Sequence, residues 1–293
     1  MTLESGRFTT FAPAKLNLGL EILGKRRDGY HDLVTIFVAV RPEDEVALEA
    51  ADRVALVVDD PALAGDDNLA LRALLMLADH AEIAPNAAVS LRKRIPAAAG
   101  LGGASSDAAA VLLLARDRWQ LPIPDADLAD LAAALGSDVP FFLRGGCALA
   151  TGRGEVLSPL PPPRDAWFVI VSPAVDIPRK TATLYGTLRP DDFSDGSRVR
   201  EQSGRIADGL DLGPVLLGNA FERPLYALRP DLADLPPLMR RLGAPAVALS
   251  GAGPTHYAVL DDPDAAAALA ARLRDALADR ARVFVSPPLP AID

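Results

Sequence analysis

The sequence predicts an α+β fold. Segments with strand character and segments with helix character alternate along the chain, but without the regular strand–helix–strand repeat of a doubly wound parallel sheet. With 293 residues, half of them hydrophobic, the chain can bury one large core or two medium ones. Residues 159–163 contain four prolines, which neither a helix nor a central strand tolerates, so we place a domain boundary there. The predicted domains are residues 1–160 and 161–293.

The strands of the N-terminal half are predicted from β-branched residues and from alternation. The run LVTIFVAV at 33–40 is rich in residues that suit strands. Val89, Leu91 and Ile95 alternate with polar residues, which predicts a half-buried strand that ends at Pro96. The other strands predicted in this half are residues 8–23, which a turn interrupts, 44–49, 53–59 and the end of 140–149, which begins as a loop.

Three helices are predicted in the same half. Asp67 or Asn68 can cap a helix near 69–81, because leucines and an alanine follow on one face. An Ala/Leu-rich stretch behind a glycine loop should form a buried helix that extends to about Trp119. A shorter helix over 127–135 is stopped by Gly136.

The C-terminal half combines a few strands with one long helix. We predict strands at 167–171, 245–250, 256–260 and 283–286, the third antiparallel to the second, and a helix at 264–280. The segment SDGSRVREQSGR at 194–205 is so polar that we expect a loop.

Charge and cysteine content limit the class of protein. The formal net charge is −9, which argues against a general binder of nucleic acid or of membrane surfaces. Only four of the thirty basic residues are lysines. Cys147 is the single cysteine, and three scattered histidines make a structural zinc site unexpected. The first fifteen residues lack a signal or transit pattern, and we expect a cytoplasmic protein.

The sharpest chemical feature is the glycine loop at 100–107, GLGGASSD, which opens a helix. Glycines let the backbone approach a ligand, and the first N–H groups of a helix carry partial positive charge, so the loop suits a phosphate. Alternatively, Ser105 and Ser106 only cap the helix and the glycines only form a turn. The loop has no lysine for a P-loop and has Ser105 where the dinucleotide motif needs glycine. The hydrolase motif G-x-S-x-G also fails, because Ser106 and Asp107 follow Ser105.

The wider segment PAAAGLGGASSDAA at 96–109 resembles the second motif of the galactokinase, homoserine kinase, mevalonate kinase and phosphomevalonate kinase (GHMP) superfamily. APAKLNLGL at 12–20 is similar to the first motif, and LSGAGPT at 249–255 to the third. Within the superfamily the chain looks like the 4-diphosphocytidyl-2-C-methyl-D-erythritol kinases, through DGYH at 28–31 and LGSDVPFFLRGG at 135–146. Ala104 departs from the family, which usually has glycine there.

This resemblance implies a two-domain architecture and a reaction. The N-terminal domain would resemble ribosomal protein S5 domain 2, the C-terminal domain would be ferredoxin-like, and the site would lie in the cleft between them. The reaction implied is ATP-dependent phosphorylation of the 2-hydroxyl of 4-diphosphocytidyl-2-C-methyl-D-erythritol, in the non-mevalonate isoprenoid pathway. The implied cofactors are ATP and Mg²⁺, and the partner is this small cytidine diphosphate ester. No metal ligands are predicted.

The resemblance also assigns residues. Asp138 would be the catalytic base and Lys15 its charged partner, since an ammonium near a carboxylate keeps it ionised and favours a developing alkoxide. Asn17 alternates with Lys15 on one strand face, so both would point to the same side. The substrate-binding residues implied are Asn17, Tyr30, His31, Phe37, Gly251, Gly253 and Thr255. The ATP-binding residues implied are Asn68, Ala97, Ala98, Ala99, Gly100, Leu101, Gly102, Gly103, Ala104, Ser105, Ser106 and Asp107.

Simpler interpretations stand beside several of these assignments. Asp138 could serve only as a turn or cap residue, Asn68 only as a helix cap, and Phe37 only as part of the core. Arg153 has no predicted role. Two other functions remain open: a different superfamily member, either a kinase or diphosphomevalonate decarboxylase, and a ligand sensor without turnover.

Overall fold

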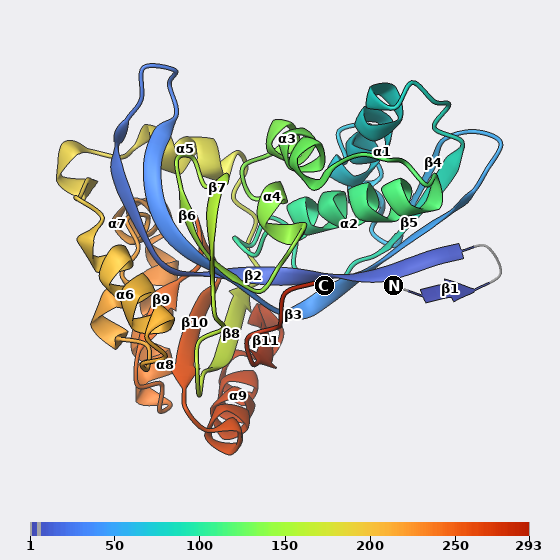
Figure 1. Ribbon diagram of the computed structural model, residues 1–293. Helices are drawn as coiled ribbons and strands as arrows, with labels where there is room; N and C mark the ends of the chain where they lie inside the picture. The colour runs from blue at the N-terminus through green and yellow to red at the C-terminus, as the bar shows by residue number, and fades with distance from the viewer. Residues whose placement is uncertain (1, 5–6, 293) are drawn as a thin grey trace.

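A pair of long antiparallel strands runs through the whole molecule. The computed structural model describes residues 2–4 and 7–292. β2 (Arg7–Lys25) has 19 residues and β3 (His31–Ala50) has 20, so each spans about 60 Å at roughly 3.3 Å per residue. Figure 1 shows this β2–β3 pair crossing from one end of the structure to the other. Both sheets and most of the helices are arranged around this pair.

The first sheet grows from both edges of the β2–β3 pair. β1 (Thr2–Glu4) pairs with β2, and along the other edge β3 pairs with β5 (Ala87–Arg92) at one end and β6 (Cys147–Thr151) at the other. β7 (Val156–Leu160) pairs with β6, and β4 (Ala55–Val58) lies parallel to β5. β4 and β5 are the only parallel pair among the described strands.

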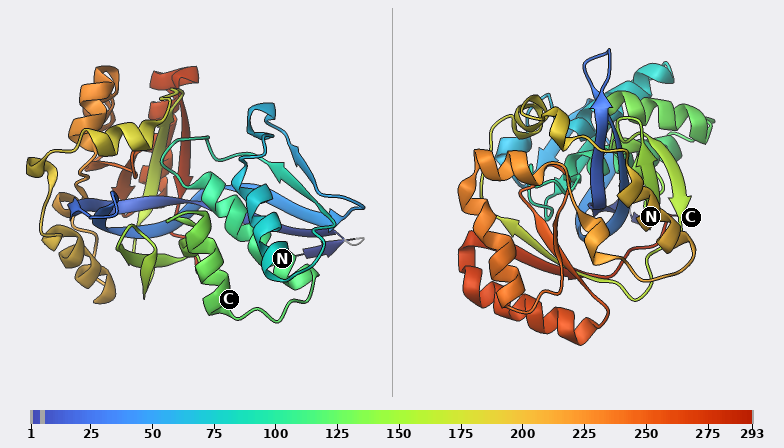
Figure 2. Two further views of the ribbon diagram at one scale, coloured as in Figure 1. Left: turned by 90° about the horizontal axis from the view of Figure 1, so that it is seen from above. Right: turned by 90° about the vertical axis from the view of Figure 1, so that its left-hand side faces the viewer.

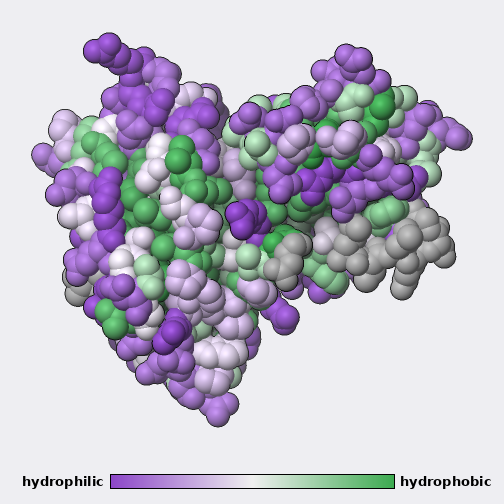
Figure 3. Space-filling model, viewed as in Figure 1, coloured by the Kyte–Doolittle hydropathy of each residue, from purple (hydrophilic) through white to green (hydrophobic). Residues whose placement is uncertain are grey.

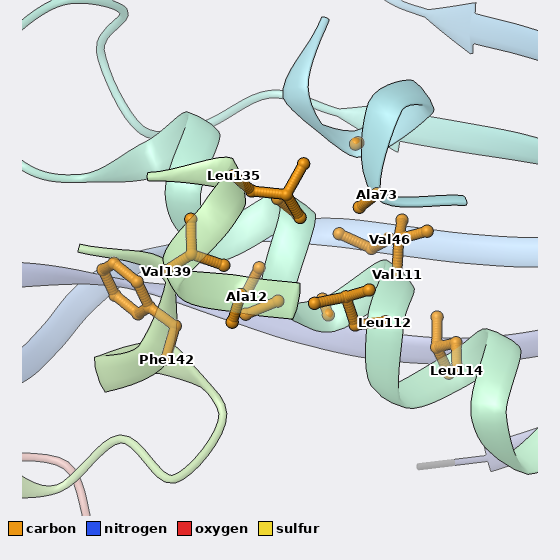
Figure 4. Close-up of a cluster of buried hydrophobic side chains, with 14 of the residues drawn as sticks. Ala12, Val46, Ala73, Val111, Leu112, Leu114, Leu135, Val139 and Phe142 are labelled. Atoms are coloured by element: carbon orange, nitrogen blue, oxygen red, sulfur yellow. The ribbon is translucent and has the colours of Figure 1, made fainter. Parts of the chain in front are cut away.

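Helices cover one face of this sheet. They are α1 (Leu69–His80), α2 (Gly103–Arg118), α3 (Asp125–Leu135) and α4 (Val139–Phe142). α2 is buried on most of its faces because its small residues let α1 and the sheet approach closely. Figure 4 shows Val111 and Leu112 of α2 in this core with Val46 of β3 and Leu135 of α3.

A second, antiparallel sheet forms the other side of the molecule. Its strand order is β11 (Ala281–Ser286), β8 (Trp167–Pro173), β10 (His256–Leu260) and β9 (Val247–Leu249). Alternate residues of β8 serve two cores: Phe168 and Ile170 pack toward Leu16 and Ile36 of the β2–β3 pair, whereas Val169 packs toward the helices. Those helices are α8 (Leu235–Arg241) and α9 (Pro263–Leu277).

The remaining elements lie along the end of the β2–β3 pair nearest its hairpin, as the two views in Figure 2 make visible. They are α5 (Lys180–Gly186), α6 (Ser197–Ala207) and α7 (Glu222–Leu228). The 3₁₀ turns are η1 (Pro61–Leu63), η2 (Pro190–Asp192), η3 (Pro214–Leu217), η4 (Pro230–Asp234) and η5 (Ala278–Arg280). No described helix is both long and apolar enough to span a bilayer.

The predicted class is confirmed. The start of 140–149 is the helical turn α4 and not a loop. Three further predictions need correction. Residues 8–23 are not broken by a turn: β2 is one strand whose register against β3 shifts after Pro13, between Asn17 and Leu20, and between Ile22 and Gly24. The predicted strands 33–40 and 44–49 are one strand, β3. The chain passes from the first sheet to the second between β7 and β8, beside the proline-rich segment, and the domain boundary itself stays a prediction.

The third correction concerns residues 194–205, which we expected to form a loop. Most of this segment lies in α6. Val199, Gln202, Ser203 and Ile206 are buried on one face, a helical spacing that the polar composition conceals. The carboxylate of Glu21, on β2, accepts a hydrogen bond of 2.9 Å from the Val199 N–H and so holds the first turn. That contact joins residues 178 apart in sequence.

Candidate active site

A cavity of about 1120 Å³ opens over the middle of the β2–β3 pair. β2 and β3 form its floor, the glycine loop and the start of α4 form one wall, and the segment 176–186 that leads into α5 forms the opposite wall. The space-filling view in Figure 3 shows a hollow between these two walls. The structure therefore brings the first and second motifs to one place.

Lys15 and Asp138 meet in this cavity. The Lys15 Nζ lies 3.5 Å from Asp138 Oδ2, and the Lys15 side chain is almost completely buried, whereas the carboxylate is one-third exposed. Asp138 occupies the N-cap position of α4, but its side chain makes no capping hydrogen bond. The simpler interpretation as a cap therefore fails, and the carboxylate remains free to face the cavity.

Asn17 fixes the ammonium of Lys15. Its Oδ1 accepts a 2.6 Å hydrogen bond from Lys15 Nζ, which confirms that the two side chains share a face. Asn17 Nδ2 in turn donates to Thr35 Oγ1, and Thr35 donates to the Gly19 carbonyl. The Lys15 Nζ also lies 5.0 Å from the centre of the Phe37 ring. The ammonium thus has one position, set by β2 and β3.

Aromatic side chains gather at the hairpin end of the cavity. His31 stacks on Tyr185 of α5, with ring centres 5.1 Å apart, and the Arg153 guanidinium lies 4.7 Å from the centre of the exposed Tyr30 ring. Burial and the nearby charge of Lys25 lower the pKa of His31, so its ring is neutral near pH 7. This end presents flat neutral rings and two cations, Arg153 and Lys25.

Phe37 is different from these rings. It is 2% exposed and packs against Phe141 with ring centres 5.1 Å apart, as the simpler interpretation expected. It still contributes to the cavity floor beneath Lys15. Its predicted stacking on the substrate stays a prediction.

The glycine loop lies against the cavity with its helix end uncapped. Gly102 is the N-cap residue of α2, and no side chain caps the helix, so Ser105 and Ser106 lie inside the first turn. The alternative that these serines cap the helix is therefore wrong. Of the predicted loop residues, Ala98, Gly100 and Gly102 line the cavity, and Leu101 anchors the loop by accepting from the Lys15 N–H at 2.9 Å.

The two glycines that line the cavity are needed for close packing. Both have positive φ, +82° at Gly100 and +74° at Gly102. A Cβ on Gly102 would lie 2.8 Å from Phe142 and 3.1 Å from Lys15. The neighbouring side chains therefore require glycine at position 102, whether or not a ligand also approaches the backbone there.

The rest of the predicted ATP-binding residues lie outside the cavity. Asp107 is buried and forms an ion pair with Lys93, which also pairs with the buried Asp44. Burial raises the pKa of Asp107 to about 7. Asn68 caps α1 through a 2.9 Å hydrogen bond from the Ala70 N–H, and its amide donates to the Leu63 carbonyl, so its capping role is confirmed. The other residues of this group are Ala97, Ala99, Gly103, Ala104, Ser105 and Ser106.

The third motif reaches the cavity through Gly251 and Ala252. A Cβ on Gly251 would lie 3.3 Å from both Lys15 Nζ and Asn17 Oδ1, so only glycine lets the turn approach the pair. Gly253 and Thr255 do not line the cavity. A Cβ on Gly253 would meet Leu225 and Leu249, and Thr255 is fully buried.

Sequence reasoning missed several residues of the site. Tyr185 and Thr35 belong to no motif, and Arg153 had no role. Lys180 lies between the glycine loop and the third motif. The only feature of the sequence that could have drawn attention to Lys180 is that lysines are scarce in this chain.

The cavity is basic although the protein is acidic. Five basic side chains line it against two carboxylates: Lys15, Lys25, Arg153, Arg179 and Lys180 against Asp138 and Asp176. Such a cavity attracts polyanions by its local field. No group of three or more potential metal-binding side chains occurs among the described residues.

Comparisons with known proteins agree with this geometry. Residues 68–146 match the model of the GHMP kinases N terminal domain, and residues 201–279 match that of the GHMP kinases C terminal. The 4-diphosphocytidyl-2-C-methyl-D-erythritol kinase of Dehalococcoides mccartyi is 38% identical over 262 residues, which cover 88% of this chain and 91% of that protein. The chain belongs to the GHMP kinase family. The kinase of the same name from Geobacillus kaustophilus is 37% identical over 261 residues, covering 87% and 89%.

Solved structures of GHMP kinases share this fold. A crystal structure of 4-(cytidine 5'-diphospho)-2C-methyl-D-erythritol kinase superposes with a TM-score of 0.79 at 36% identity, covering 95% of this chain and 98% of that one. Homoserine kinase from Cytophaga hutchinsonii gives 0.75 at 19% identity, covering 100% and 99%, and shows the common fold. The two-domain GHMP kinase architecture is confirmed.

Proposed function

We propose that this GHMP kinase transfers the γ-phosphoryl group of ATP to the 2-hydroxyl of 4-diphosphocytidyl-2-C-methyl-D-erythritol, a step of non-mevalonate isoprenoid synthesis. The observation that carries the proposal is the Lys15–Asp138 pair, which lies beside an uncapped glycine loop in a basic cavity. The sequence relatives that bear this activity in their names support it.

Asp138 is the base in the proposed mechanism. Its carboxylate accepts the proton of the 2-hydroxyl, and the hydroxyl oxygen forms a bond to the γ-phosphorus as the bond between that phosphorus and the leaving ADP oxygen breaks. Lys15 stabilises the negative charge on the attacking oxygen, because its ammonium is fixed by Asn17 on the same side of β2. A base positioned in this way contributes about 10²–10⁴ in rate.

The glycine loop and the start of α2 bind the phosphates of ATP in this proposal. The first-turn N–H groups have no side-chain cap to compete with a phosphate. Ser106 Oγ, in this first turn, is buried without a hydrogen-bond partner among the described residues, so this hydroxyl fits the Mg²⁺ that would accompany ATP, whereas Asp107 is already paired with Lys93. Bound there, Mg²⁺ would neutralise charge on the phosphates.

The cytidine part of the substrate fits the aromatic end of the cavity. Tyr30 and the stacked pair of His31 and Tyr185 offer ring faces to a base, and neutral His31 can hydrogen-bond to its edge. Arg153 and Lys25 provide positive charge toward the diphosphate. This assignment gives Arg153, which the sequence left without a role, a place in substrate binding.

The test is an ADP-release assay with purified protein, ATP and Mg²⁺. We expect release with 4-diphosphocytidyl-2-C-methyl-D-erythritol and none above background with mevalonate or mevalonate diphosphate. Release with a mevalonate-type substrate alone would favour another GHMP kinase or diphosphomevalonate decarboxylase. Binding of both ligands without release would leave the ligand sensor as the function.

A further inference from the structure

Lys180 is a buried cation whose position the proposed mechanism does not yet use. It begins α5, is 7% exposed and lines the cavity. Its Nζ donates a 2.5 Å hydrogen bond to the Ala98 carbonyl of the glycine loop and another to the Gly253 carbonyl of the third motif. One ammonium therefore connects α5 to both motifs.

Lys180 lacks an anionic partner among the residues that the structure describes. No carboxylate there forms an ion pair with it, whereas Lys15 has one such partner and Lys93 has two. Two carbonyl groups satisfy two of its three N–H groups. A buried charge is costly unless an opposite charge compensates it. Burial, together with the positive charge of Lys15, lowers the pKa of Lys180 to about 8.

The backbone around Lys180 is held in unusual conformations. Arg179, immediately before it, has a φ of +51°, and Ala98, whose carbonyl it contacts, has a φ of +52°. Each left-handed non-glycine residue costs about 1–2 kcal/mol. The fold thus maintains two strained residues on either side of one uncompensated cation, an arrangement typical of a functional site.

We propose that Lys180 binds the phosphate chain that lies between the glycine loop and the third motif, adding a second fixed positive charge opposite Lys15. The ligand class is a polyphosphate, and the missing counter-ion of Lys180 is the phosphoryl group in transfer. The inference rests on the proposed function for its catalytic consequence, but the binding of polyphosphate can be measured without the alcohol substrate. The alternative is a purely structural tether between the two motifs.

Three substitutions separate charge from tethering. Lys180→Met removes the charge at nearly the same length, Lys180→Gln keeps an N–H donor for the carbonyls, and Lys180→Arg keeps the charge. Arg27→Met is the matched control, because it removes one positive charge from an exposed residue that does not line the cavity. Thermal unfolding of each variant verifies that it is folded.

The first measurement is the binding of inorganic triphosphate by titration calorimetry. We expect the Met and Gln variants to bind at least 10-fold more weakly than wild type, the Arg variant within about 3-fold, and Arg27→Met like wild type. If Lys180→Gln binds triphosphate as tightly as wild type, Lys180 is only a tether between the two motifs, and the proposal is overturned. Unchanged binding by a folded Met variant, or no binding by wild type, would also overturn it.

The second measurement is turnover. Loss of one fixed donor to the transferring group lowers rates by about 10²–10³, so we expect the Met variant to lose kcat by that factor while the KM for the cytidyl substrate stays within about 3-fold. If wild type does not turn over this substrate but triphosphate binding still depends on the charge at position 180, the proposed function fails and the role of Lys180 stands. A normal kcat in the Met variant contradicts the role of Lys180 but leaves the proposed function intact.

Discussion

Replacing Gly100 by alanine tests whether the glycine loop and the third motif are in contact as described. Gly100 has a φ of +82°, and a Cβ there would overlap the Ser250 carbonyl oxygen and lie 2.8 Å from the Gly253 carbonyl oxygen. Both are backbone atoms, which no rotamer change can move. The left-handed conformation costs about 1–2 kcal/mol for an L-residue, and overpacking costs about 1–3 kcal/mol. We therefore expect a loss of about 2–5 kcal/mol.

The measurement is the free energy of unfolding from a denaturant titration, with ATP affinity determined in parallel. Gly204→Ala is the matched control: Gly204 is an exposed glycine inside α6, and a Cβ there has no neighbour within 4 Å. Because alanine favours a helix over glycine by about 1 kcal/mol, the control should gain stability. The reasoning is refuted if Gly100→Ala is within about 0.5 kcal/mol of wild type, which is the usual effect of an ordinary surface substitution.

Three other predictions concern the two ends of the cavity and the turn behind it. Asp138→Asn should lower kcat by about 10²–10⁴ with ATP binding retained, and unchanged single-turnover rates would remove Asp138 from the mechanism. Tyr185→Ala removes the ring on which His31 stacks and should raise the KM for the cytidyl substrate about 10-fold with little change in the KM for ATP, since one base–aromatic stack contributes about 1–3 kcal/mol. Burial lowers the pKa of His256 to about 4, so below pH 6.5 only the unfolded chain takes up this proton, and stability is lost as the pH falls. Between pH 7 and 4.5 this loss should be about 2–3 kcal/mol, and denaturant titrations of His256→Gln should lack it.

The residues that sequence reasoning located are those whose chemistry is encoded in motifs. Lys15 and Asn17 alternate on a strand, and alternation alone predicts that they share a face, which the 2.6 Å hydrogen bond confirms. The approach of Asp138 to Lys15 depends on tertiary packing between residues 123 apart in sequence, and only the family resemblance anticipated it. The alternation of residues thus predicted the Lys15–Asn17 pair, and the family resemblance predicted the Lys15–Asp138 pair.

The residues that sequence reasoning missed depend on contacts between distant segments. The first turn of α6 is held by Glu21 from β2, a contact that the local sequence cannot show. The buried face of α6 includes the polar residues Gln202 and Ser203, and the sequence therefore predicted a loop. Lys180 and Tyr185 lie on a short helix without a motif, and their importance comes from what the fold places opposite them. In the same way, Asp107 was assigned to ATP from its loop position, whereas its ion pair with Lys93 depends on the neighbouring strand.

The length of the β2–β3 pair has a consequence for motion. Residues of these two strands belong to the cores on both sides of the molecule, so neither sheet has a complete hydrophobic interior without them. Because the β2–β3 pair belongs to both cores, a bend in this pair would disrupt both of them, so we do not expect a hinge there. Lys15, near the midpoint of β2, stands between two core residues, Ala14 and Leu16, and its position is therefore tied to the packing of both halves.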